Sequence, residues 1–372
     1  MNINSKLSSR LKVGLLGATG MVGRRLAQLL VDHPWFEPVI FVGSETSIGT
    51  SYRLLWERKE KLLQGHYGMQ LWNVQHFPKA LDGTTISGFP DLLNSDIEIV
   101  FSSLPERAGA FEATLLDSGR IVFSNSPYRR FDVSAALVVA EVNGNEMREC
   151  RLIKNPNCVT SGLALVLAPI ASRYGLDAVV VTTYQSISGR GDARYAADLV
   201  IGNVYPLFGS EEQTEGNIRR ELDRVFRSSF VASITCNRVC VQEGHFVEVR
   251  IKTKNPIESA EEVLHTLSLF NPLKSLGLPL SPAQPLVVVH EAGRPRPLQD
   301  SDHSRGMAVA VGNISIDDDV FDLRLTYVVN NLVRGAAGGA VLNSELWFHQ
   351  KMRARSDSAE TLRTRTALHS SS

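Results

Sequence analysis

The chain has 372 residues, enough for two domains, and its 39 basic and 39 acidic residues cancel. This balance argues against nucleic acid or an anionic membrane as a partner, and no apolar run reaches the roughly 18 residues of a membrane span. Four cysteines without a Cys-x-x-Cys pair predict neither a disulfide framework nor a metal site. Residues 1–10 form a polar extension without the apolar core of a signal peptide, so we expect a cytoplasmic protein.

A strand, a glycine-rich turn and a helix follow one another at the start of the chain. Residues 11–16 are a short apolar run, and residues 21–31 repeat apolar side chains at helical spacing. Between them lies Gly17-Ala-Thr-Gly-Met-Val-Gly23, whose glycines allow a tight turn and close approach of a pyrophosphate to a helix N-terminus. The pattern predicts a dinucleotide site with contacts from Gly17, Thr19, Gly20, Met21 and Val22.

The loop after the second strand, residues 36–42, is where the adenosine ribose of a dinucleotide would lie. Ser44 and Ser47 are its cofactor-binding candidates. Glu45 would accept a hydrogen bond from a ribose 2′-hydroxyl and favour NAD, whereas the hydroxyls of the loop would donate to a 2′-phosphate and favour NADP. No basic residue precedes Arg53 in this loop, so its residues leave the choice open.

Strand and helix patterns continue to alternate through residues 97–101, 106–118 and 121–123. This alternation predicts a parallel sheet in an α/β, Rossmann-type domain. Ser103 and Leu104 follow the first of these strands, at the edge where such sheets bind ligands, and are further cofactor-binding candidates.

A polar loop, Ser124-Asn-Ser-Pro-Tyr-Arg-Arg130, comes after the last of these strands. Arg129 and Arg130 are either solvated surface charges, or one of them binds a substrate anion through its guanidinium fork. Asn125 and Arg130 are the substrate-side candidates of this loop.

Asn155-Pro-Asn-Cys-Val-Thr160 runs directly into an apolar segment at helical spacing, residues 161–170. Cys158 therefore lies at a helix start, where free backbone N–H groups favour a thiolate and, with Asn157, would stabilise an oxyanion. The alternative is a buried cysteine that packs as a small hydrophobe, with Asn157 as an ordinary N-cap.

Beyond Cys158 the pattern changes to strands at residues 178–183, 246–253, 286–289, 307–316 and 321–329, with helices at 211–226 and 258–270. These elements predict an α+β catalytic and dimerisation domain with a mixed, largely antiparallel sheet, one face covered by helices and the other by a second subunit. The expected division is a dinucleotide-binding domain over 11–157, this second domain over 158–330, a helix of small residues returning to the first domain over 331–352, and a disordered tail over 353–372.

A reactive cysteine needs a base, and His245 is the best candidate among nine histidines. It follows a glycine at the mouth of an amphipathic strand, with Arg238 seven residues before it. Gln185 at a strand exit would orient the thiol or a substrate carbonyl. Together these residues predict a nicotinamide enzyme that interconverts an aldehyde and an activated acyl group through a cysteine.

Five ordered motifs resemble aspartate-semialdehyde dehydrogenase, most closely its archaeal and fungal branch. They are the turn at 17–23, the cysteine segment at 155–160, Gln185-Ser-Ile-Ser-Gly189, Cys236-Asn-Arg-Val-Cys-Val-Gln-Glu-Gly-His245 and Val333-Arg-Gly-Ala-Ala-Gly338. The resemblance implies NADPH-dependent reduction of aspartyl phosphate in a homodimer or homotetramer. By position it implies the following roles: Cys158 as nucleophile, His245 as acid–base, Gln185 orienting the intermediate, Arg238 binding the substrate α-carboxylate, Glu211 binding its amine, and Ser188, Gly189 and Asn331 on the nicotinamide side.

The chain departs from the family pattern around the anion sites. Thr214 stands where the family usually has a lysine near the phosphate, and Pro127 and Tyr128 replace a lysine and an asparagine. The loop Ser124-Asn-Ser-Pro is similar to that of malonyl-CoA reductase, a paralogue that cleaves a thioester. The leading expectation is therefore an NADP-dependent aspartyl-phosphate reductase, with NAD also compatible. The alternatives are a paralogue acting on another acyl phosphate or thioester, and a cofactor-binding regulator with little turnover.

Overall fold

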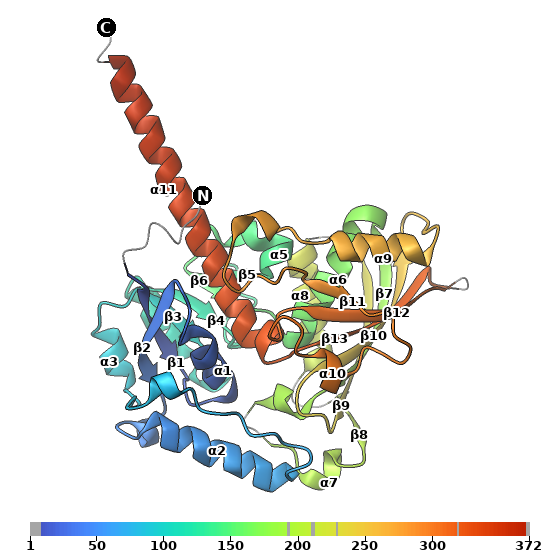
Figure 1. Ribbon diagram of the computed structural model, residues 1–372, viewed down its shortest axis with the longest axis horizontal. Coiled ribbons are helices and arrows are strands. Elements are labelled where there is room, and N and C mark those ends of the chain that lie inside the picture. The colour runs from blue at the N-terminus through green and yellow to red at the C-terminus, as the bar shows by residue number, and fades with distance from the viewer. Residues whose placement is uncertain (1–8, 192–193, 210–212, 228–229, 318–319, 370–372) are drawn as a thin grey trace.

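The computed structural model describes residues 9–191, 194–209, 213–227, 230–317 and 320–369 (Figure 1). The chain forms two sheets, each with its own apolar core, and a long C-terminal helix that starts between them and runs out past the first sheet (Figure 1). No helix among these residues has the length and apolar character needed to cross a membrane.

The first sheet has six strands, all parallel, in the order β2-β1-β3-β4-β6-β5. The strands are β1 (Leu11–Leu16), β2 (Phe36–Val42), β3 (Ile99–Ser102), β4 (Ile121–Ser124), β5 (Ala135–Leu137) and β6 (Leu152–Lys154). The helices that connect them are α1 (Met21–Leu30), α2 (Tyr52–Tyr67), α3 (Phe89–Leu93), α4 (Ala110–Asp117) and α5 (Ala140–Asn143). The chain order reverses between β1 and β3, so the carboxyl ends of these two strands form the crevice in which such sheets bind ligands.

The second sheet has seven strands in the order β11-β12-β13-β10-β7-β9-β8. Its elements are α6 (Cys158–Tyr174), β7 (Leu176–Gln185), α7 (Ala197–Val200), β8 (Val204–Pro206), α8 (Thr214–Phe226), β9 (Val231–Val239), β10 (His245–Thr253), α9 (Ala260–Leu269), β11 (Leu286–Val288), α10 (Pro297–Asp300), β12 (Val309–Ile316) and β13 (Leu323–Val329). The pairs β7–β9 and β11–β12 are parallel and the other pairs are antiparallel. The prediction of a mixed, largely antiparallel sheet is confirmed.

The two faces of this sheet differ in chemistry. In β10, Val247, Val249 and Ile251 are fully buried and belong to a core that includes side chains of α6, α8 and α9. Glu248 and Arg250 alternate with them and remain partly exposed on the opposite face. The alternation expected from the sequence is therefore present: helices cover one face of the sheet, and the other face remains half exposed.

The last helix, α11 (Gly338–His369), differs from the prediction of a disordered tail over 353–372. Its first turns are buried in the core of the first sheet through Ala340, Val341, Leu342 and Leu346. No glycine or proline follows Gly339, and alanine, leucine, glutamate and arginine favour a helix, so a helix nucleated in the core propagates through the polar segment to His369. Residues 370–372 lie outside the described part.

Candidate active site

The topology of the second sheet brings three predicted site residues to one edge. Strands β7 and β9 are parallel, and Gln185 and Arg238 are partners in their register at the carboxyl ends. Strand β10 runs antiparallel to β7 and begins at His245, next to the pair Phe246–Tyr184. Helix α6 begins at Cys158, so its N-terminus reaches the same edge.

The structure brings Cys158 and His245 into contact. The Cys158 Sγ atom lies 3.0 Å from His245 Nε2. His245 is fully buried, whereas Cys158 retains partial exposure. The sulfur is therefore in contact with an imidazole, and the residue that carries it is not sealed off from the surface.

The other ring nitrogen decides the tautomer of His245. Nδ1 accepts a hydrogen bond from the backbone N–H of Ser186 at 3.0 Å, so in the neutral ring the proton lies on Nε2 and faces the sulfur. Burial, and then the nearby Arg238 guanidinium, hold the pKa of His245 well below its usual value. In the free enzyme the ring is therefore neutral and donates to Cys158.

The helix start does favour the thiolate of Cys158, as expected, but burial opposes it more strongly in the free enzyme. Burial raises the pKa of Cys158 to about 11, although Arg238 and the backbone N–H of Val159 lower it. The desolvation of a thiolate here costs more free energy than the helix N-terminus and the arginine contribute by stabilising its charge. The thiol instead donates to Asn157 Oδ1 at 3.7 Å, and the same oxygen caps α6 by accepting from Val159 N–H at 2.9 Å. The amide oxygen of Asn157, not its N–H, faces the sulfur.

Two glycines allow the close approach of backbone to these side chains. A Cβ at Gly335, in the π-helical turn Val333–Ala337, would lie 2.5 Å from Cys158 Cβ. A Cβ at Gly189 would lie 2.6 Å from Arg238 Nη1 and 3.0 Å from His245 Cε1. The small residues after Asn331 therefore pack against the reactive cysteine, a role that the sequence did not identify.

Arg238 is held rigidly beside the thiol. It is buried, its Nε donates to Tyr195 Oη at 3.1 Å, and its Nη1 donates to the carbonyl oxygen of Ser186 at 2.9 Å. Gln185 is also buried, and its Nε2 donates to Thr183 Oγ1 at 3.1 Å. Tyr195 was not expected from the sequence, because no local pattern marks it as the partner of an arginine 43 residues away.

The residues expected on the nicotinamide side form a network behind His245. Asn331 Nδ2 donates to Ser188 Oγ at 2.9 Å, and Asn331 Oδ1 accepts from Ser186 Oγ at 2.9 Å and from Gly244 N–H at 3.0 Å. Ser186 Oγ also lies 3.1 Å from His245 Nδ1. This network joins the cofactor-side candidates to the catalytic ring.

On the other side of the thiol, Arg130 and Asn125 form a polar cluster with unused donors. Arg130 Nη1 donates to Glu221 Oε1 at 3.1 Å and Nη2 to the carbonyl oxygen of Asn125 at 2.8 Å. Arg130 Nε and both side-chain polar atoms of Asn125 are buried without a hydrogen-bond partner in the described part of the chain. The two donors among these atoms, Arg130 Nε and Asn125 Nδ2, fit an oxyanion, whereas Asn125 Oδ1 requires a donor. The predicted amine ligand Glu211 lies outside the described residues.

The loop that carries Asn125 and Arg130 is supported by a buried lysine. Lys154 Nζ donates to Glu112 Oε2 at 2.5 Å and to Ser124 Oγ at 2.8 Å. Lys154 and Ser124 are fully buried, and burial lowers the pKa of Lys154. No pattern in the sequence identified Lys154 or its partner on α4.

The glycine turn after β1 is shaped for a pyrophosphate. Gly17 has φ +82°, which a side chain rarely adopts, and a Cβ at Gly23 would lie 2.2 Å from the Gly17 carbonyl oxygen. Helix α1 is capped by Gly20 without a side-chain hydrogen bond, so its first N–H groups face outward at Met21 and Val22. Thr19 lies in the same turn, and Ser103 Oγ donates to the Gly17 carbonyl at 3.1 Å. Leu104 is partly buried beside β3.

In the ribose loop, the two serines differ. Ser44 is exposed, whereas Ser47 is buried and its hydroxyl donates to the Ser44 carbonyl at 2.7 Å. Glu45 is exposed next to Ser44. Arg53 forms an ion pair with Asp82, so its guanidinium already has an anionic partner.

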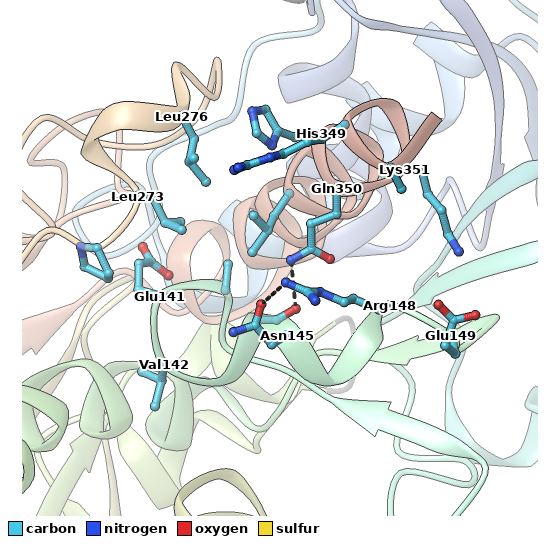
Figure 2. Close-up of a pocket in the computed structure, with 16 residues that line it drawn as sticks. Glu141, Val142, Asn145, Arg148, Glu149, Leu273, Leu276, His349, Gln350 and Lys351 are labelled. Carbon is cyan, nitrogen blue, oxygen red and sulfur yellow. Dashed lines mark hydrogen bonds between the residues drawn. The ribbon is translucent and has the colours of Figure 1, made fainter. Parts of the chain in front are cut away.

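A cavity of about 650 Å³ lies elsewhere, between α11, α5 and residues 272–276. Figure 2 shows Glu141, Arg148, Leu273 and His349 around it. None of the predicted site residues lines this cavity, so size alone would have pointed away from the reactive cysteine.

Comparison with known proteins places these features in a family. The model described as semialdehyde dehydrogenase, NAD binding domain, matches residues 12–150, and the semialdehyde dehydrogenase, dimerisation domain, matches residues 167–334. The aspartate-semialdehyde dehydrogenase of Methanothermobacter thermautotrophicus is 34% identical over 356 residues, covering 90% of this chain and 98% of its own. The malonyl CoA reductase (NADP) of Metallosphaera sedula is 30% identical over 361 residues, covering 90% and 96%.

Among solved structures, aspartate semialdehyde dehydrogenase with NADP from Candida albicans has a TM-score of 0.78 at 26% identity, covering 92% of this chain and 99% of its own. The predicted fold class, the resemblance and the nicotinamide-dinucleotide cofactor are confirmed. The chain belongs to the semialdehyde dehydrogenase family.

Proposed function

We propose that the protein is an NADP-dependent aspartate-semialdehyde dehydrogenase, which interconverts L-aspartyl 4-phosphate and L-aspartate 4-semialdehyde plus phosphate through a thioester on Cys158. The observation that carries the proposal is the 3.0 Å contact between Cys158 Sγ and His245 Nε2 at the edge where Arg238 is also held. The relatives named for this activity support it, since one of them matches nine-tenths of the chain.

The thiol has to lose its proton before it can attack. His245 can accept that proton on Nε2 only when its Nδ1 carries the ring proton. Ser186 Oγ, 3.1 Å from Nδ1, then accepts this N–H and donates its own hydrogen to Asn331 Oδ1. While its hydrogen is donated to Asn331, the Ser186 hydroxyl can only accept from Nδ1–H and so favours the reactive tautomer, whereas the Ser186 backbone N–H favours the resting one.

The thiolate then attacks the acyl carbon, and the C–O bond breaks with its electron pair leaving on phosphate. A reduced nicotinamide, when bound, supplies the hydride that converts the thioester to a thiohemiacetal. His245 returns its proton to the sulfur as the C–S bond breaks, so the aldehyde leaves and the thiol is restored. Gln185 is assigned to orient this intermediate.

Charged side chains on the two sides of the sulfur suit the two ends of the substrate. Arg238 is assigned to the α-carboxylate, since its guanidinium is fixed by Tyr195 and the Ser186 carbonyl. Arg130 and Asn125 are assigned to the phosphate, because their unused donors, Arg130 Nε and Asn125 Nδ2, fit an oxyanion. Glu211 is assigned to the substrate amine.

The site has the features that a dinucleotide needs. The uncapped N-terminus of α1 and the turn at Gly17 would hold the pyrophosphate, and Ser44 the ribose side. NADP is favoured over NAD because the named Candida and Metallosphaera proteins are both associated with it. The proposed compartment is the cytoplasm, where a reactive thiol stays reduced.

The second domain matches a dimerisation domain, which supports an oligomer. We assign a homodimer or homotetramer in which the half-exposed face of the second sheet meets its counterpart. This face carries Glu248, Arg250 and the ring pair of Tyr184 and Phe246. Light scattering on the purified protein measures the mass, and a monomer would contradict this assignment.

Steady-state oxidation of aspartate semialdehyde tests the activity, with phosphate or coenzyme A as acceptor and NADP or NAD as oxidant. We expect reduction of NADP that requires phosphate and is lost in Cys158→Ser. A folded enzyme that shows no turnover under any of the four conditions would refute the proposal.

A second candidate is a reductase of an acyl thioester. The observation that favours it is the ion pair of Arg130 with Glu221, which partly neutralises the arginine, together with the neutral Thr214 where the resemblance implies a lysine. Turnover that requires coenzyme A and ignores phosphate would select this candidate.

A further inference from the structure

Glu221 is a buried carboxylate that no sequence motif identified. It lies on α8, facing the start of α6, and is fully inaccessible to solvent. Its Oε1 accepts from Arg130 Nη1 at 3.1 Å. Its Oε2 accepts from the backbone N–H of Asn157 at 2.8 Å and from Thr160 Oγ1 at 2.5 Å. One charged group therefore joins the oxyanion loop to the first turn of the helix that carries Cys158.

The first domain of the same chain contains a counterpart. Glu60 is equally buried, and it accepts from a guanidinium at Arg24 (2.9 Å), from a side-chain donor at Trp72 Nε1 (3.1 Å) and from a backbone N–H at Gln75 (2.9 Å). The two carboxylates have the same kinds of partners. They differ in place, because Glu221 lies at the N-terminus of α6 and Glu60 lies in the first domain.

The place of Glu221 matters for the sulfur. The positive end of a helix stabilises a nearby negative charge, and at α6 the Asn157 N–H already donates to the Glu221 carboxylate. Glu221 raises the pKa of Cys158 and Arg130 lowers it, so the members of this ion pair act on the thiol in opposite directions. The pair also sets the orientation of Arg130, whose Nε remains unpartnered in the described residues.

We propose that Glu221 is a positioning residue of the active site, which holds Arg130 through Oε1 and the first turn of α6 through Oε2, and whose negative charge opposes ionisation of Cys158 in the free enzyme. The proposal deepens the proposed function and relies on it only for the identity of the anion at Arg130. The state of the sulfur is a property of the free protein, whatever acyl donor the enzyme uses.

The test is the rate at which iodoacetamide alkylates Cys158 in the substrate-free protein between pH 6 and pH 11. Mass spectrometry of the Cys158 peptide is required, because Cys150 and Cys240 are also partly exposed. Glu221→Gln removes the charge that raises the pKa of Cys158, so we expect alkylation to be faster than in the wild type at pH 8. Arg130→Gln removes the opposing charge, and its alkylation should be slower than in the wild type.

Glu60→Gln is the matched control. It should lower the unfolding midpoint about as much as Glu221→Gln, since both variants remove a buried charge from similar partners. The alkylation profile of Cys158 in Glu60→Gln should be the same as in the wild type. An unchanged profile in Glu221→Gln, or a shift in the same direction for Glu221→Gln and Arg130→Gln, would overturn the proposal. If Glu221→Gln does not fold, the Arg130 variant decides, because alkylation as fast as in the wild type contradicts the opposing action of the pair. Loss of turnover with aspartate semialdehyde bears on the proposed function alone.

Discussion

Replacing Gly335 by alanine tests whether the backbone of the π-helical turn sets the position of the reactive thiol. The new Cβ would lie 2.5 Å from Cys158 Cβ and 2.8 Å from Cys158 Cα, and ordinary van der Waals contact begins at 3.4 Å. The two segments must therefore move apart by about 0.9 Å, the difference between these separations. Neither can yield by a side-chain rotation, since the contact is with the first atoms of Cys158.

Two effects follow from this displacement. Overpacking of a close contact costs about 1–3 kcal/mol of the free energy of unfolding. A reacting group displaced by about 1 Å loses on the order of 10²-fold in rate, so kcat should fall by that factor. The Cys158–His245 contact of 3.0 Å has no room for such a shift.

The assay combines kcat for semialdehyde oxidation with urea unfolding. Gly65→Ala is the control, because Gly65 is exposed on α2 and a Cβ there meets nothing within 4 Å. We expect Gly65→Ala to keep wild-type activity and to gain up to about 1 kcal/mol of stability from helix propensity. A Gly335→Ala enzyme with the kcat and unfolding midpoint of the wild type would refute this account of the close contact.

Three further predictions concern the charges and caps of the site. The pKa of Cys158 is about 11 in the folded chain against 9.0 for an ordinary thiol. As pH rises, the unfolded chain therefore loses this proton before the folded chain does. The contribution of this thiol to the free energy of unfolding should be fully present below about pH 9 and fall by up to about 3 kcal/mol as pH rises toward 11. In urea titrations Cys158→Ser should lack this part of the fall, and a fall identical to that of the wild type would contradict the raised pKa. Asn157→Ala removes the side-chain cap of α6 and should lower the free energy of unfolding by about 1 kcal/mol in the same titration. Asn157→Asp keeps a capping oxygen and should retain most of this stability. Lys154→Met leaves the Glu112 carboxylate buried without its cation and should lower the free energy of unfolding by about 3–5 kcal/mol, measured from the unfolding midpoint. The double variant with Glu112→Leu should recover part of this loss, and equal stability of the single and double variants would show that the unpaired carboxylate is not the source of the destabilisation.

Much of the fold follows from local patterns in the chain. The alternation of short apolar strands with amphipathic helices up to Asn157 requires a parallel sheet, because each crossover returns the chain in the same direction. The alternation of Val247, Val249 and Ile251 with charged residues indicates a strand with one covered face, and the structure has it. The tail over 353–372 was judged from its polar composition, and the prediction missed that a helix started in the core continues through residues of good helix propensity.

The sequence by itself determined the chemical types at the site and their order: a glycine turn after the first strand, a cysteine at a helix start, and a histidine at the mouth of a strand. These are local properties of residues near one another in the chain. The tertiary structure alone decided that His245 meets the sulfur, that its resting proton faces Cys158, that burial raises the pKa of the thiol, and that Glu221 and Gly335 belong to the site. Each of these depends on distances between segments remote in the chain and on the water excluded between them, and neither quantity is encoded in a local pattern.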